Sequence, residues 1–212
     1  MAVRKLEVPG LEDLVGAGVY YGAALTEAAL YRDRDVFVIG GANSAGQGAM
    51  FFSRYARKVS IVVRGDSLSA GMSQYLVDRI HETANVEIVP HTRVAGVRGE
   101  GKLEAITLED VRTGARREEE AAAMFIFIGT APHTGMVADL VQLDAKGFVL
   151  TGRDLMVDGK PPKGWTLDRD PYPFETSVPG IFAAGDARQG SGKRVAAAVG
   201  EGSATVSMVH QY

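Results

Sequence analysis

Two glycine-rich turns of this 212-residue chain follow apolar runs, and their residue types are suited to holding a dinucleotide. The first turn follows Val36–Ile39 and reads Gly40-Gly41-Ala42-Asn43-Ser44-Ala45. It approximates the G-x-G-x-x-G/A fingerprint, with Gly40 in the first position, Ala42 in the second and Ala45 in the third. In that fingerprint the first glycine allows the tight turn, the second lets the backbone approach a pyrophosphate, and the third position packs helix on strand.

The first turn departs from the fingerprint at Ala42, where glycine is usual. One methyl group there is expected to weaken or shift phosphate binding, and Gly41 beside it to relieve part of the strain. Backbone N–H groups and the positive end of the following helix would hold the phosphates. The alternative is a turn that only packs a helix onto a strand and binds nothing.

Arg64 is the residue that bears on which nucleotide would bind. It directly follows the apolar run Val59–Val63, and Asp66 comes two residues later. An acidic residue at the end of the second strand suits the ribose 2′-hydroxyl of NAD, whereas arginine offers fork-shaped donors to a 2′-phosphate. The position therefore favours NADPH over NADH, with a solvated surface arginine as the alternative.

The second glycine turn follows a strand-like run, Ile181–Ala184, and consists of Gly185-Asp186. After it, small residues predict a helix from about Arg194 to His210. Taken alone, Asp186 is equally explained as a helix cap or turn residue.

The elements that would position these residues alternate between strand and helix patterns, which predicts an α/β fold. Residues 36–63 have the length of one βαβ unit, and Asn43 or Ser44 is expected to cap a helix reaching about Tyr55. Further expected elements are a helix over Ser73–Thr83, a strand at Val86–Val89, and three strands at Val94–Val97, Leu103–Val111 and a run ending at Ile128. Those three strands suggest an antiparallel meander added to a parallel sheet. Two further segments are interpreted as irregular or exposed: a proline-containing loop over 158–173, and the acidic run Glu118–Glu120 as a solvated loop or strand end.

Composition excludes several other classes of protein. A net charge of −3 without a basic tract argues against a nucleic-acid partner. Zero cysteines exclude a disulfide framework, a zinc–thiolate site and a cysteine nucleophile. The four histidines lack metal-ligand spacing. With neither an apolar run of about 18 residues nor a signal peptide, the chain is expected to have no membrane span and to be cytoplasmic.

The order of several segments resembles the thioredoxin reductase family of flavoproteins, and in particular its members without the redox cysteine pair. The resemblance spans about Val3 to Tyr212 and rests on GVYYGAALTEA, VFVIGGANSAGQ, VSIVVRG, FIFIGTAPHT and TSVPGIFAAGDARQGSGKRVAAAVGEGSA. It implies a Rossmann-like NADPH domain at 36–150, with a parallel sheet and an antiparallel meander. That domain would be flanked by partial segments of an FAD-binding domain at 1–35 and 151–212. In such proteins hydride passes from NADPH to flavin N5, and homodimers are usual.

The same resemblance assigns further cofactor contacts. Gly129, in the IGTAPHT segment, falls among them. Gly185-Asp186 matches a Gly-Asp pair whose aspartate hydrogen-bonds the ribityl chain of the flavin. Arg194-Val195-Ala196 matches a stretch whose backbone approaches the isoalloxazine edge, where an N–H or helix terminus stabilises negative charge on the reduced ring.

Three departures from the family limit what is expected. The Cys-x-x-Cys pair is replaced by Gly22-Ala23-Ala24-Leu25, so these residues cannot form a dithiol relay, and the electron acceptor is left open between a small redox protein, a quinone and oxygen. Of the usual basic cluster after the second strand only Arg64 is present, so a single arginine is left to favour NADPH. A second G-x-G-x-x-G, which holds FAD in this family, is not found before Val36, so the chain is expected to be a fragment or a shortened form with poor flavin affinity.

Three functions from different classes remain open at this point. The first is an NADPH-dependent flavin oxidoreductase, or a fragment of one, that uses no dithiol relay. The second is a non-catalytic nucleotide-binding, sensing or interaction module. The third, a plain NAD(P) dehydrogenase, is weak because no Tyr–Lys pair or histidine is placed as a proton shuttle.

Overall fold

The computed structural model describes residues 1–22 and 25–212, which form two compact units. One unit is Lys5–Gly129, and the other combines Met1–Arg4 with Thr130–Tyr212. These boundaries differ from the expected segments 1–35, 36–150 and 151–212. Part of the chain before residue 36 joins the sheet of the first unit through strand β2 (Val19–Tyr21), and residues 130–150 belong with the second unit rather than with the sheet.

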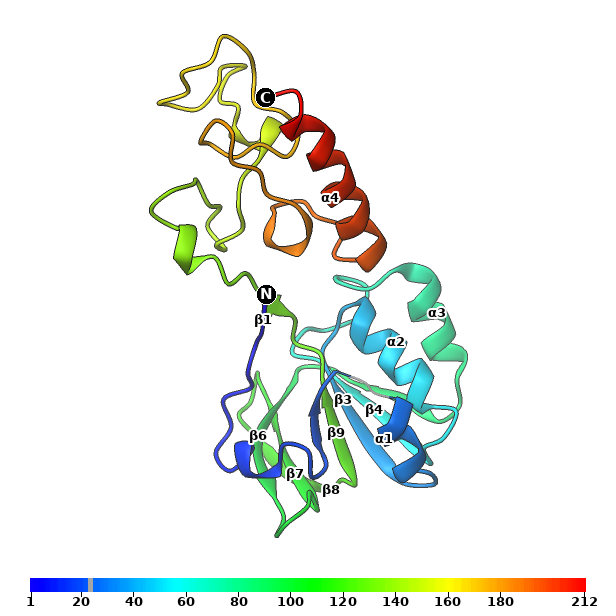
Figure 1. The fold of residues 1–212 in the computed structure, drawn as a ribbon. Helices are drawn as coiled ribbons and strands as arrows, with labels where there is room; N and C mark the ends of the chain where they lie inside the picture. The colour runs from blue at the N-terminus through cyan, green and yellow to red at the C-terminus, as the bar shows by residue number, and fades with distance from the viewer. Residues whose placement is uncertain (23–24) are drawn as a thin grey trace. The chain divides into compact units, whose positions relative to one another are not determined.

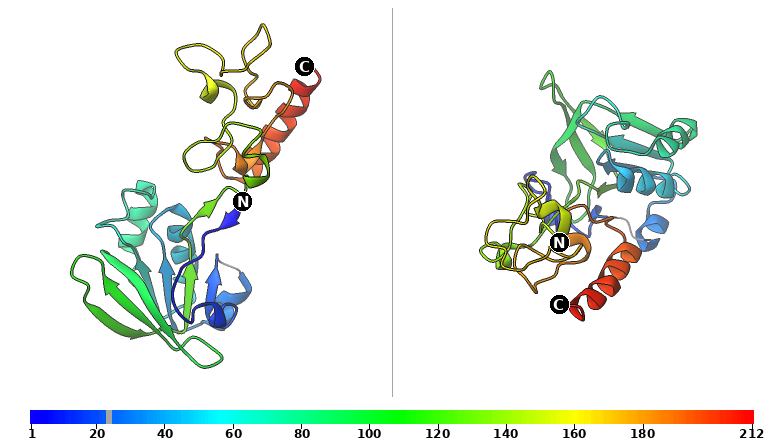
Figure 2. Two further views of the ribbon diagram at one scale, coloured as in Figure 1. Left: turned by 90° about the vertical axis from the view of Figure 1, so that its left-hand side faces the viewer. Right: turned by 90° about the horizontal axis from the view of Figure 1, so that it is seen from above.

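The first unit is built on a five-stranded, all-parallel sheet (Figure 1). The strand order is β2 (Val19–Tyr21), β9 (Ala123–Ile126), β3 (Asp35–Ile39), β4 (Lys58–Val62) and β5 (Val86–Val89). The helices of this unit are α1 (Leu25–Leu30), α2 (Asn43–Phe52) and α3 (Gln74–Glu82). Figures 1 and 2 show α2 and α3 together on one face of the sheet. The predicted α/β class is confirmed.

Alternation along the strands explains why the sheet is covered on both faces. Val36 and Val38 pack on the helix side, whereas Phe37 and Ile39 belong to a separate apolar cluster on the opposite side. All four side chains are buried. A strand buried on both faces reads as a continuous apolar run, which is how it was recognisable in the sequence.

The antiparallel meander is present, but one of its strands was wrongly predicted. It consists of β6 (Thr92–Arg98), β7 (Ala105–Asp110) and β8 (Arg116–Glu120). The run ending at Ile128 was expected as its third strand, and instead contributes β9 to the parallel sheet. Strand β8 carries no apolar side chain and is held by backbone pairing and by ion pairs. Arg98 pairs with Glu118 at the surface at 2.8 Å, and Arg116 pairs with the buried carboxylate of Glu109 at 2.7 Å.

Helix α2 differs from the prediction at both ends. It ends at Phe52 rather than near Tyr55, because Ser53–Ala56 form turns that bond back to Ala49, Phe51 and Phe52. At its start Ala42 is the N-cap residue, with no side-chain cap. The expected cap by Asn43 or Ser44 is therefore wrong, and the Asn43 side chain bonds elsewhere, as described below.

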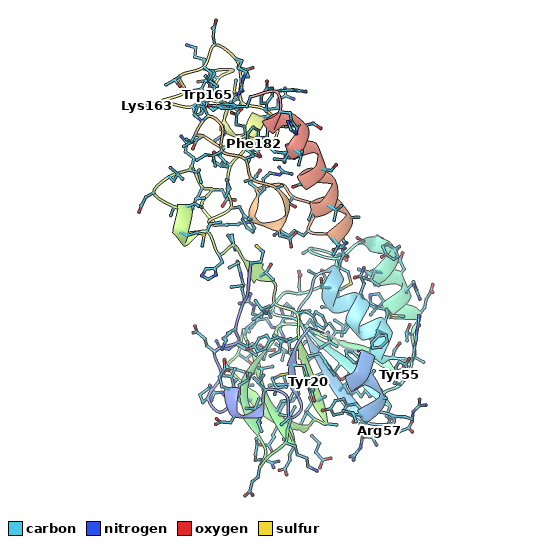
Figure 3. The ribbon with its side chains drawn as sticks, in the orientation of Figure 1. Tyr20, Tyr55, Arg57, Lys163, Trp165 and Phe182 are labelled. Carbon is cyan, nitrogen blue, oxygen red and sulfur yellow. The ribbon has the colours of Figure 1, made fainter. Side chains whose placement is uncertain are left out.

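The amino ends of β3 and β4 are joined by an ion pair. Arg57 Nη2 donates to Asp35 Oδ2 at 2.7 Å and Arg57 Nε to Asp35 Oδ1 at 2.8 Å. This fork holds the pKa of Asp35 below its ordinary value. Figure 3 labels Arg57 near Tyr55, at the end of the sheet where these two strands begin. The pair adds a side-chain link to the backbone pairing of β3 and β4 at their amino ends.

The second unit contains little regular structure. Strands β1 (Ala2–Val3) and β10 (Thr130–Ala131) pair antiparallel. Three short 3₁₀ helices, η2 (Gly135–Val137), η3 (Gly152–Leu155) and η4 (Gly185–Ala187), precede the long helix α4 (Val195–Val209). The remaining 3₁₀ helix, η1 (Glu12–Leu14), lies in the first unit. Helix α4 agrees with the prediction, and residues 158–173 form the expected loop without helix or strand.

The expected strand at Ile181–Ala184 is wrong. Phe182 makes an isolated bridge with Glu175, and Ile181 and Ala183 bond to Thr176 and Phe174. These contacts tie the segment to the residues just before it, as in a hairpin, and no further strand of the described chain extends the pairing. The apolar pattern is present without the neighbouring strands needed to make a sheet.

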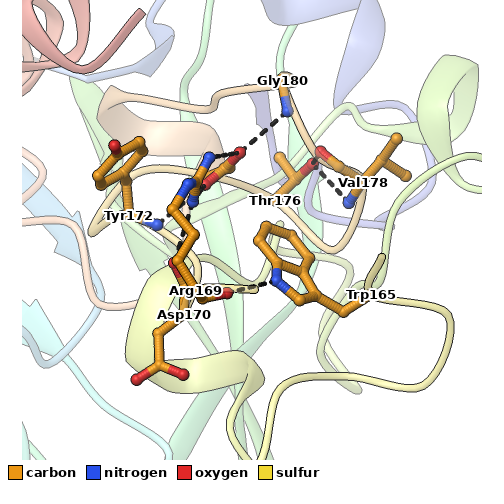
Figure 4. A network of polar contacts seen from close by, with 8 residues as sticks. Trp165, Arg169, Asp170, Tyr172, Thr176, Val178 and Gly180 are labelled. Carbon is orange, nitrogen blue, oxygen red and sulfur yellow. Dashed lines mark hydrogen bonds and ion pairs between the residues drawn. The ribbon is translucent and has the colours of Figure 1, made fainter. Parts of the chain in front are cut away.

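A buried carboxylate fixes the end of the 158–173 loop (Figure 4). Glu175 is 0% exposed and accepts hydrogen bonds from Arg169 at 2.7 and 3.1 Å, from Tyr172 N at 3.0 Å and from Gly180 N at 2.9 Å. The Arg169 guanidinium lies 3.9 Å from the Tyr172 ring centroid. Trp165 Nε1 donates to Arg169 O at 2.6 Å, which brings the single tryptophan into the same network.

Candidate functional site

The first turn is built so that only glycine fits at Gly40. Its φ is +140°, and a Cβ there would lie 2.4 Å from the carbonyl oxygen of Phe127. Gly40 N donates to Val62 O at 3.1 Å, and Phe127 N donates to Ile39 O at 2.7 Å. The ends of β3, β4 and β9 thus converge on this turn.

Ala42 is accommodated without backbone strain. It has φ −104° and ψ 176°, an extended conformation open to any L-residue, and its side chain is exposed. The second position of the fingerprint therefore does not require glycine for its own conformation in this chain. The Ala42 carbonyl accepts from Gly46 N at 3.1 Å. The N–H groups of Asn43, Ser44 and Ala45 precede that bond and have no acceptor within the helix.

A loop folds against the turn and is fixed by Asn43. Asn43 Oδ1 accepts a hydrogen bond from Ser73 N at 2.8 Å. A Cβ on Gly71 would lie 3.2 Å from Gly41 O, and one on Gly46 would lie 2.7 Å from Met72 Sδ. These close approaches hold the segment between β4 and α3 beside the start of α2.

Arg64 and Gly129 lie at the same edge of the sheet as the turn. In the parallel register Ile39 pairs with Val62 and with Ile126, so the residues that follow these three positions share the carboxyl edge. Arg64 is exposed and makes no ion pair or side-chain hydrogen bond within the described residues. Gly129 is exposed as well, with φ +88°. The structure therefore brings together all the site residues predicted for the first unit.

The strand order adds a reason for a ligand at this edge. From β3 the chain proceeds through β4 to β5 on one side, and β9 lies on the other side of β3. The edge beside β3 and β9 is thus a topological switch point, where open α/β sheets bind their ligands.

The second turn lies in the other unit. Gly185 has φ +74°, and a Cβ there would lie 3.3 Å from Ala198 Cβ of α4. Asp186 is half-buried within η4, and its carboxylate makes no hydrogen bond or ion pair with another described residue. It is available to an external donor. Interpreting Asp186 as a helix cap finds no support, since η4 has no side-chain cap.

The predicted contacts at the start of α4 are exposed. Arg194 is the N-cap residue, and its carbonyl accepts from Ala198 N at 2.9 Å. Val195 is 83% exposed, and Ala196 is exposed too. The first N–H groups of α4 are therefore free to meet a ligand, as the resemblance implies.

Two residues that matter in this unit were missed from the sequence. Glu201 of α4 accepts from Gly185 N at 2.7 Å, and Arg188 pairs with it at 2.7 and 3.2 Å. One signal could have pointed to Glu201, because it is the single charged residue in the sequence of α4. Charge in such a run of small and apolar residues indicates a fixed partner.

Other features of the described residues offer no competing site chemistry. One cavity of about 630 Å³ is lined by residues such as Asp139, Lys163 and Ser177. A second cavity, of about 210 Å³, lies between α2 and α3. None of the predicted site residues lines either cavity. The described part of the chain has no cluster of three or more potential metal ligands. It also has no helix long and apolar enough to cross a membrane. The cysteine-pair position, Gly22-Ala23-Ala24-Leu25, falls partly outside the described residues, at Ala23 and Ala24.

Comparison with known proteins decides the family. The family model described as pyridine nucleotide-disulphide oxidoreductase matches residues 2–202. The chain belongs to this family. The predicted resemblance to thioredoxin reductase-like FAD/NAD(P) flavoproteins is thereby confirmed.

Individual relatives and solved structures agree with that assignment. The chain is 31% identical to a thioredoxin reductase from Treponema pallidum and 31% identical to a 34.2 kDa protein in the rubredoxin operon of Clostridium pasteurianum. Each alignment covers 99% of this chain and 61% of the relative. The thioredoxin reductase of Lactococcus lactis has a TM-score of 0.79 at 27% identity, over 98% of this chain and 62% of that structure. The thioredoxin reductase of T. acidophilum has a TM-score of 0.79 at 26% identity. The chain thus spans about three fifths of the length of these relatives.

Proposed function

We propose that Lys5–Gly129 binds NADPH at the carboxyl edge of its parallel sheet, within an oxidoreductase that passes hydride to FAD without a dithiol relay. The observation that carries the proposal is the convergence of the Gly40–Ala45 turn, Arg64 and Gly129 at the switch point of the sheet. The bound nucleotide would supply the hydride. The protein would bind and orient it.

The residues present fit a dinucleotide diphosphate. The N–H groups of Asn43, Ser44 and Ala45 have no acceptor within α2 and lie at its positive end. The side-chain oxygen of Asn43 already accepts a hydrogen bond from Ser73 N, so Asn43 would bind a ligand through its backbone N–H. Ala42 is exposed and its backbone is unstrained. Its methyl group would therefore reduce the space for a diphosphate beside the turn without blocking it.

Arg64 would select the phosphorylated nucleotide. It follows the end of β4 by two residues and has no carboxylate partner among the described residues. A guanidinium in this position offers paired donors to a 2′-phosphate and has no matching advantage for a 2′-hydroxyl.

The second unit would contribute part of a flavin site. The free carboxylate of Asp186 suits a ribityl hydroxyl, and the exposed first N–H groups of α4 suit the edge of the flavin ring that gains negative charge on reduction. The chain carries no cysteine, so electrons would leave by another route than a dithiol of these residues. The acceptor would be a small redox protein, a quinone or oxygen.

Calorimetric titration of Arg64→Ala tests the nucleotide assignment. Loss of the guanidinium should weaken NADPH binding by about ten- to a hundredfold, the scale of one charged hydrogen-bonding group, and leave NADH binding within twofold. Arg153→Ala, which removes an exposed arginine of the other unit, is the matched control and should change neither affinity.

Equal losses for NADPH and NADH in Arg64→Ala would contradict the role of Arg64 at the 2′-phosphate. No detectable NADPH binding by the folded, unsubstituted chain would contradict the proposed function itself.

A non-catalytic nucleotide-sensing module is the second candidate. It is favoured by one observation, namely that the site in Lys5–Gly129 offers backbone N–H groups and Arg64 but no side chain placed as an acid, base or nucleophile. NADPH oxidation in the presence of added FAD separates the two candidates. Turnover that depends on FAD supports the oxidoreductase, and nucleotide binding without turnover supports the sensing module.

A further inference from the structure

Glu201 is the one charged residue in the sequence of α4, and it faces its own unit rather than water. The side chain of Glu201 is 12% exposed and that of Arg188 is 14% exposed. One carboxylate oxygen accepts from Arg188 Nη2 at 2.7 Å. The other accepts from Gly185 N at 2.7 Å and from Arg188 Nε at 3.2 Å.

We propose that the Glu201–Arg188 pair has a positioning role. It holds the Gly185-Asp186 turn against α4, so that Asp186 and the first turn of α4 contact the same flavin. The proposal rests on the proposed function, because it assumes that these two elements contact one cofactor. Neither Glu201 nor Arg188 is assigned a contact with the cofactor.

Apolar packing does not fix α4 by itself. No residue of α4 is buried. Its close contacts with the turn are made by small side chains, since a Cβ on Gly185 would lie 3.3 Å from Ala198 Cβ and one on Gly192 would lie 3.3 Å from Ala197 Cβ. Small side chains of this kind interlock little, so their contacts alone would allow α4 to slide along the turn. The directional hydrogen bonds of Glu201 therefore set the register of the helix against the turn.

The pair links both proposed flavin contacts through few bonds. Glu201 bonds the N–H of Gly185, whose next residue is Asp186. In the other direction Glu201 follows Val195 by six residues of one helix, about 9 Å along its axis. A slip of α4 by one residue, about 1.5 Å, would break the bond to Gly185 and change the separation of the two flavin contacts.

The charge state of the pair is suited to a permanent clamp. The hydrogen bond from Arg188, followed by that from Gly185 N–H, holds the pKa of Glu201 below its ordinary value. The carboxylate is therefore ionised at neutral pH. Arg188 is fixed in turn, because its Nη1 donates to Gln189 O at 2.8 Å and its guanidinium lies 5.2 Å from the centroid of the Phe174 ring.

The test uses the full chain and two substitutions of Glu201. Glu201→Ala removes both the ion pair and the acceptor for Gly185 N–H, and Glu201→Gln keeps an acceptor of the same size but removes the charge. Flavin-fluorescence quenching measures the FAD dissociation constant, and NMR-detected hydrogen exchange follows the Gly185 amide. Glu82→Gln, at an exposed glutamate of the other unit, is the matched control.

The proposal predicts that Glu201→Ala raises the FAD dissociation constant at least tenfold, with a smaller rise of about threefold for Glu201→Gln. The Gly185 amide should exchange at least ten times faster in Glu201→Ala. NADPH affinity should stay within twofold, because its proposed contacts lie in Lys5–Gly129.

A double variant, Arg188→Met with Glu201→Met, separates positioning from general stability. Apolar side chains of similar length can replace a buried ion pair without loss of stability. They cannot accept from Gly185 N–H. The unfolding midpoint reported by Trp165 should therefore lie above that of Glu201→Ala, which leaves Arg188 unpaired, while the FAD dissociation constant stays at least tenfold raised. A double variant whose FAD dissociation constant returns to within twofold of the unsubstituted chain would overturn the positioning role.

Two other outcomes are decisive in different ways. An FAD dissociation constant within twofold of the unsubstituted chain in Glu201→Ala would overturn this proposal and leave the proposed function intact. If the unsubstituted chain binds no FAD, the flavin part of the proposed function fails and the flavin role of the pair fails with it. NADPH binding in that same preparation would show that the nucleotide site survives.

Discussion

At the scale of single residues, Glu175 shows how a charge is kept inside the second unit. Its carboxylate is 0% exposed and receives four hydrogen bonds, two of them from Arg169 and two from backbone N–H groups. Burial alone would raise the pKa of Glu175, but these donors together hold it below its ordinary value. The ionised form is therefore part of the folded state.

Glu175→Gln is predicted to destabilise the second unit, because it leaves Arg169 without its counter-charge in a partly buried position. Removal of one member of a buried pair typically costs about 3–5 kcal/mol, and the remaining amide and the 28% exposure of Arg169 place the expected loss of unfolding free energy at the lower end. Urea unfolding at pH 7, followed by the fluorescence of Trp165, measures it. Trp165 reports on this unit because it bonds Arg169.

The same variant makes a prediction about pH. A carboxyl group with a lowered folded-state pKa stabilises the fold above its unfolded pKa, near 4.3. That stabilisation is lost as the pH falls through the folded value. The difference between the unsubstituted chain and Glu175→Gln should therefore be full at pH 7 and shrink steadily below about pH 4. A difference that is the same at pH 7 and pH 3 would contradict the buried carboxylate network.

The sequence predicts Gly40 because a turn between a buried strand and a helix needs a residue without Cβ. The place of Arg64 at the carboxyl edge follows from its position after a second buried strand, and its role toward a nucleotide stays a prediction. Glu201 and Arg188 could not be paired from the sequence, since thirteen positions separate them and only the folded turn brings them together.

At the scale of elements, the loop between β4 and α3 depends on one side-chain hydrogen bond to the start of α2. Asn43→Ala removes the acceptor for Ser73 N–H, which lies 2.8 Å from Asn43 Oδ1. We predict that the Ser73 amide exchanges about ten times faster in NMR-detected hydrogen exchange. NADPH affinity should fall by about three- to tenfold, because the loop between β4 and α3, which lies beside the proposed site, becomes less ordered.

Gln74→Ala is the control for that substitution. It removes a surface bond to Asp78 next to Ser73 without touching the turn, and should leave both quantities unchanged. Unaltered exchange at Ser73 in Asn43→Ala would show that the loop is held by the packing of Met72 against Gly46 instead.

Elements were predictable where the sequence pattern matched the burial. The strands β3, β4 and β5 and the helix α3 were found at nearly their observed bounds, because buried strands, the half-buried apolar β5 and amphipathic helices leave strong patterns. Strand β8 was predicted only in part: Glu118–Glu120 were interpreted as a solvated loop or strand end, and they form the end of β8. The rest of β8 left no apolar pattern, because its side chains are all charged and it is held by backbone pairing. Residues 181–184 were mistaken for one because an apolar run does not reveal whether partner strands exist.

At the scale of the whole molecule, the two units differ in how they are stabilised. Both large apolar clusters lie in Lys5–Gly129, one on each face of the parallel sheet. The second unit relies more on buried charge networks around Glu175 and Glu201 and on a helix without a buried residue. The proposed NADPH site thus lies on the better-packed unit, where the strands of the sheet fix the position of the Gly40–Ala45 turn.

The α/β class and the family were predictable from the order of the motifs, whereas the division into units was not. Residues 5–35 were not assigned to the central domain, because nothing in their sequence pattern indicated that β2 pairs with β9. The functional assignment of each unit, and the homodimer implied by the resemblance, stay predictions.

Calorimetric titration of the full chain with NADPH shows whether the Gly40–Ala45 turn binds this nucleotide. We predict one site per chain with a dissociation constant in the micromolar range, typical of a dinucleotide held by backbone donors and one arginine. We also predict chemical-shift changes at the amides of Asn43, Ser44 and Ala45 on saturation. A folded chain, shown by its circular dichroism, that releases no heat with NADPH and shifts none of these amides would exclude NADPH binding at this turn.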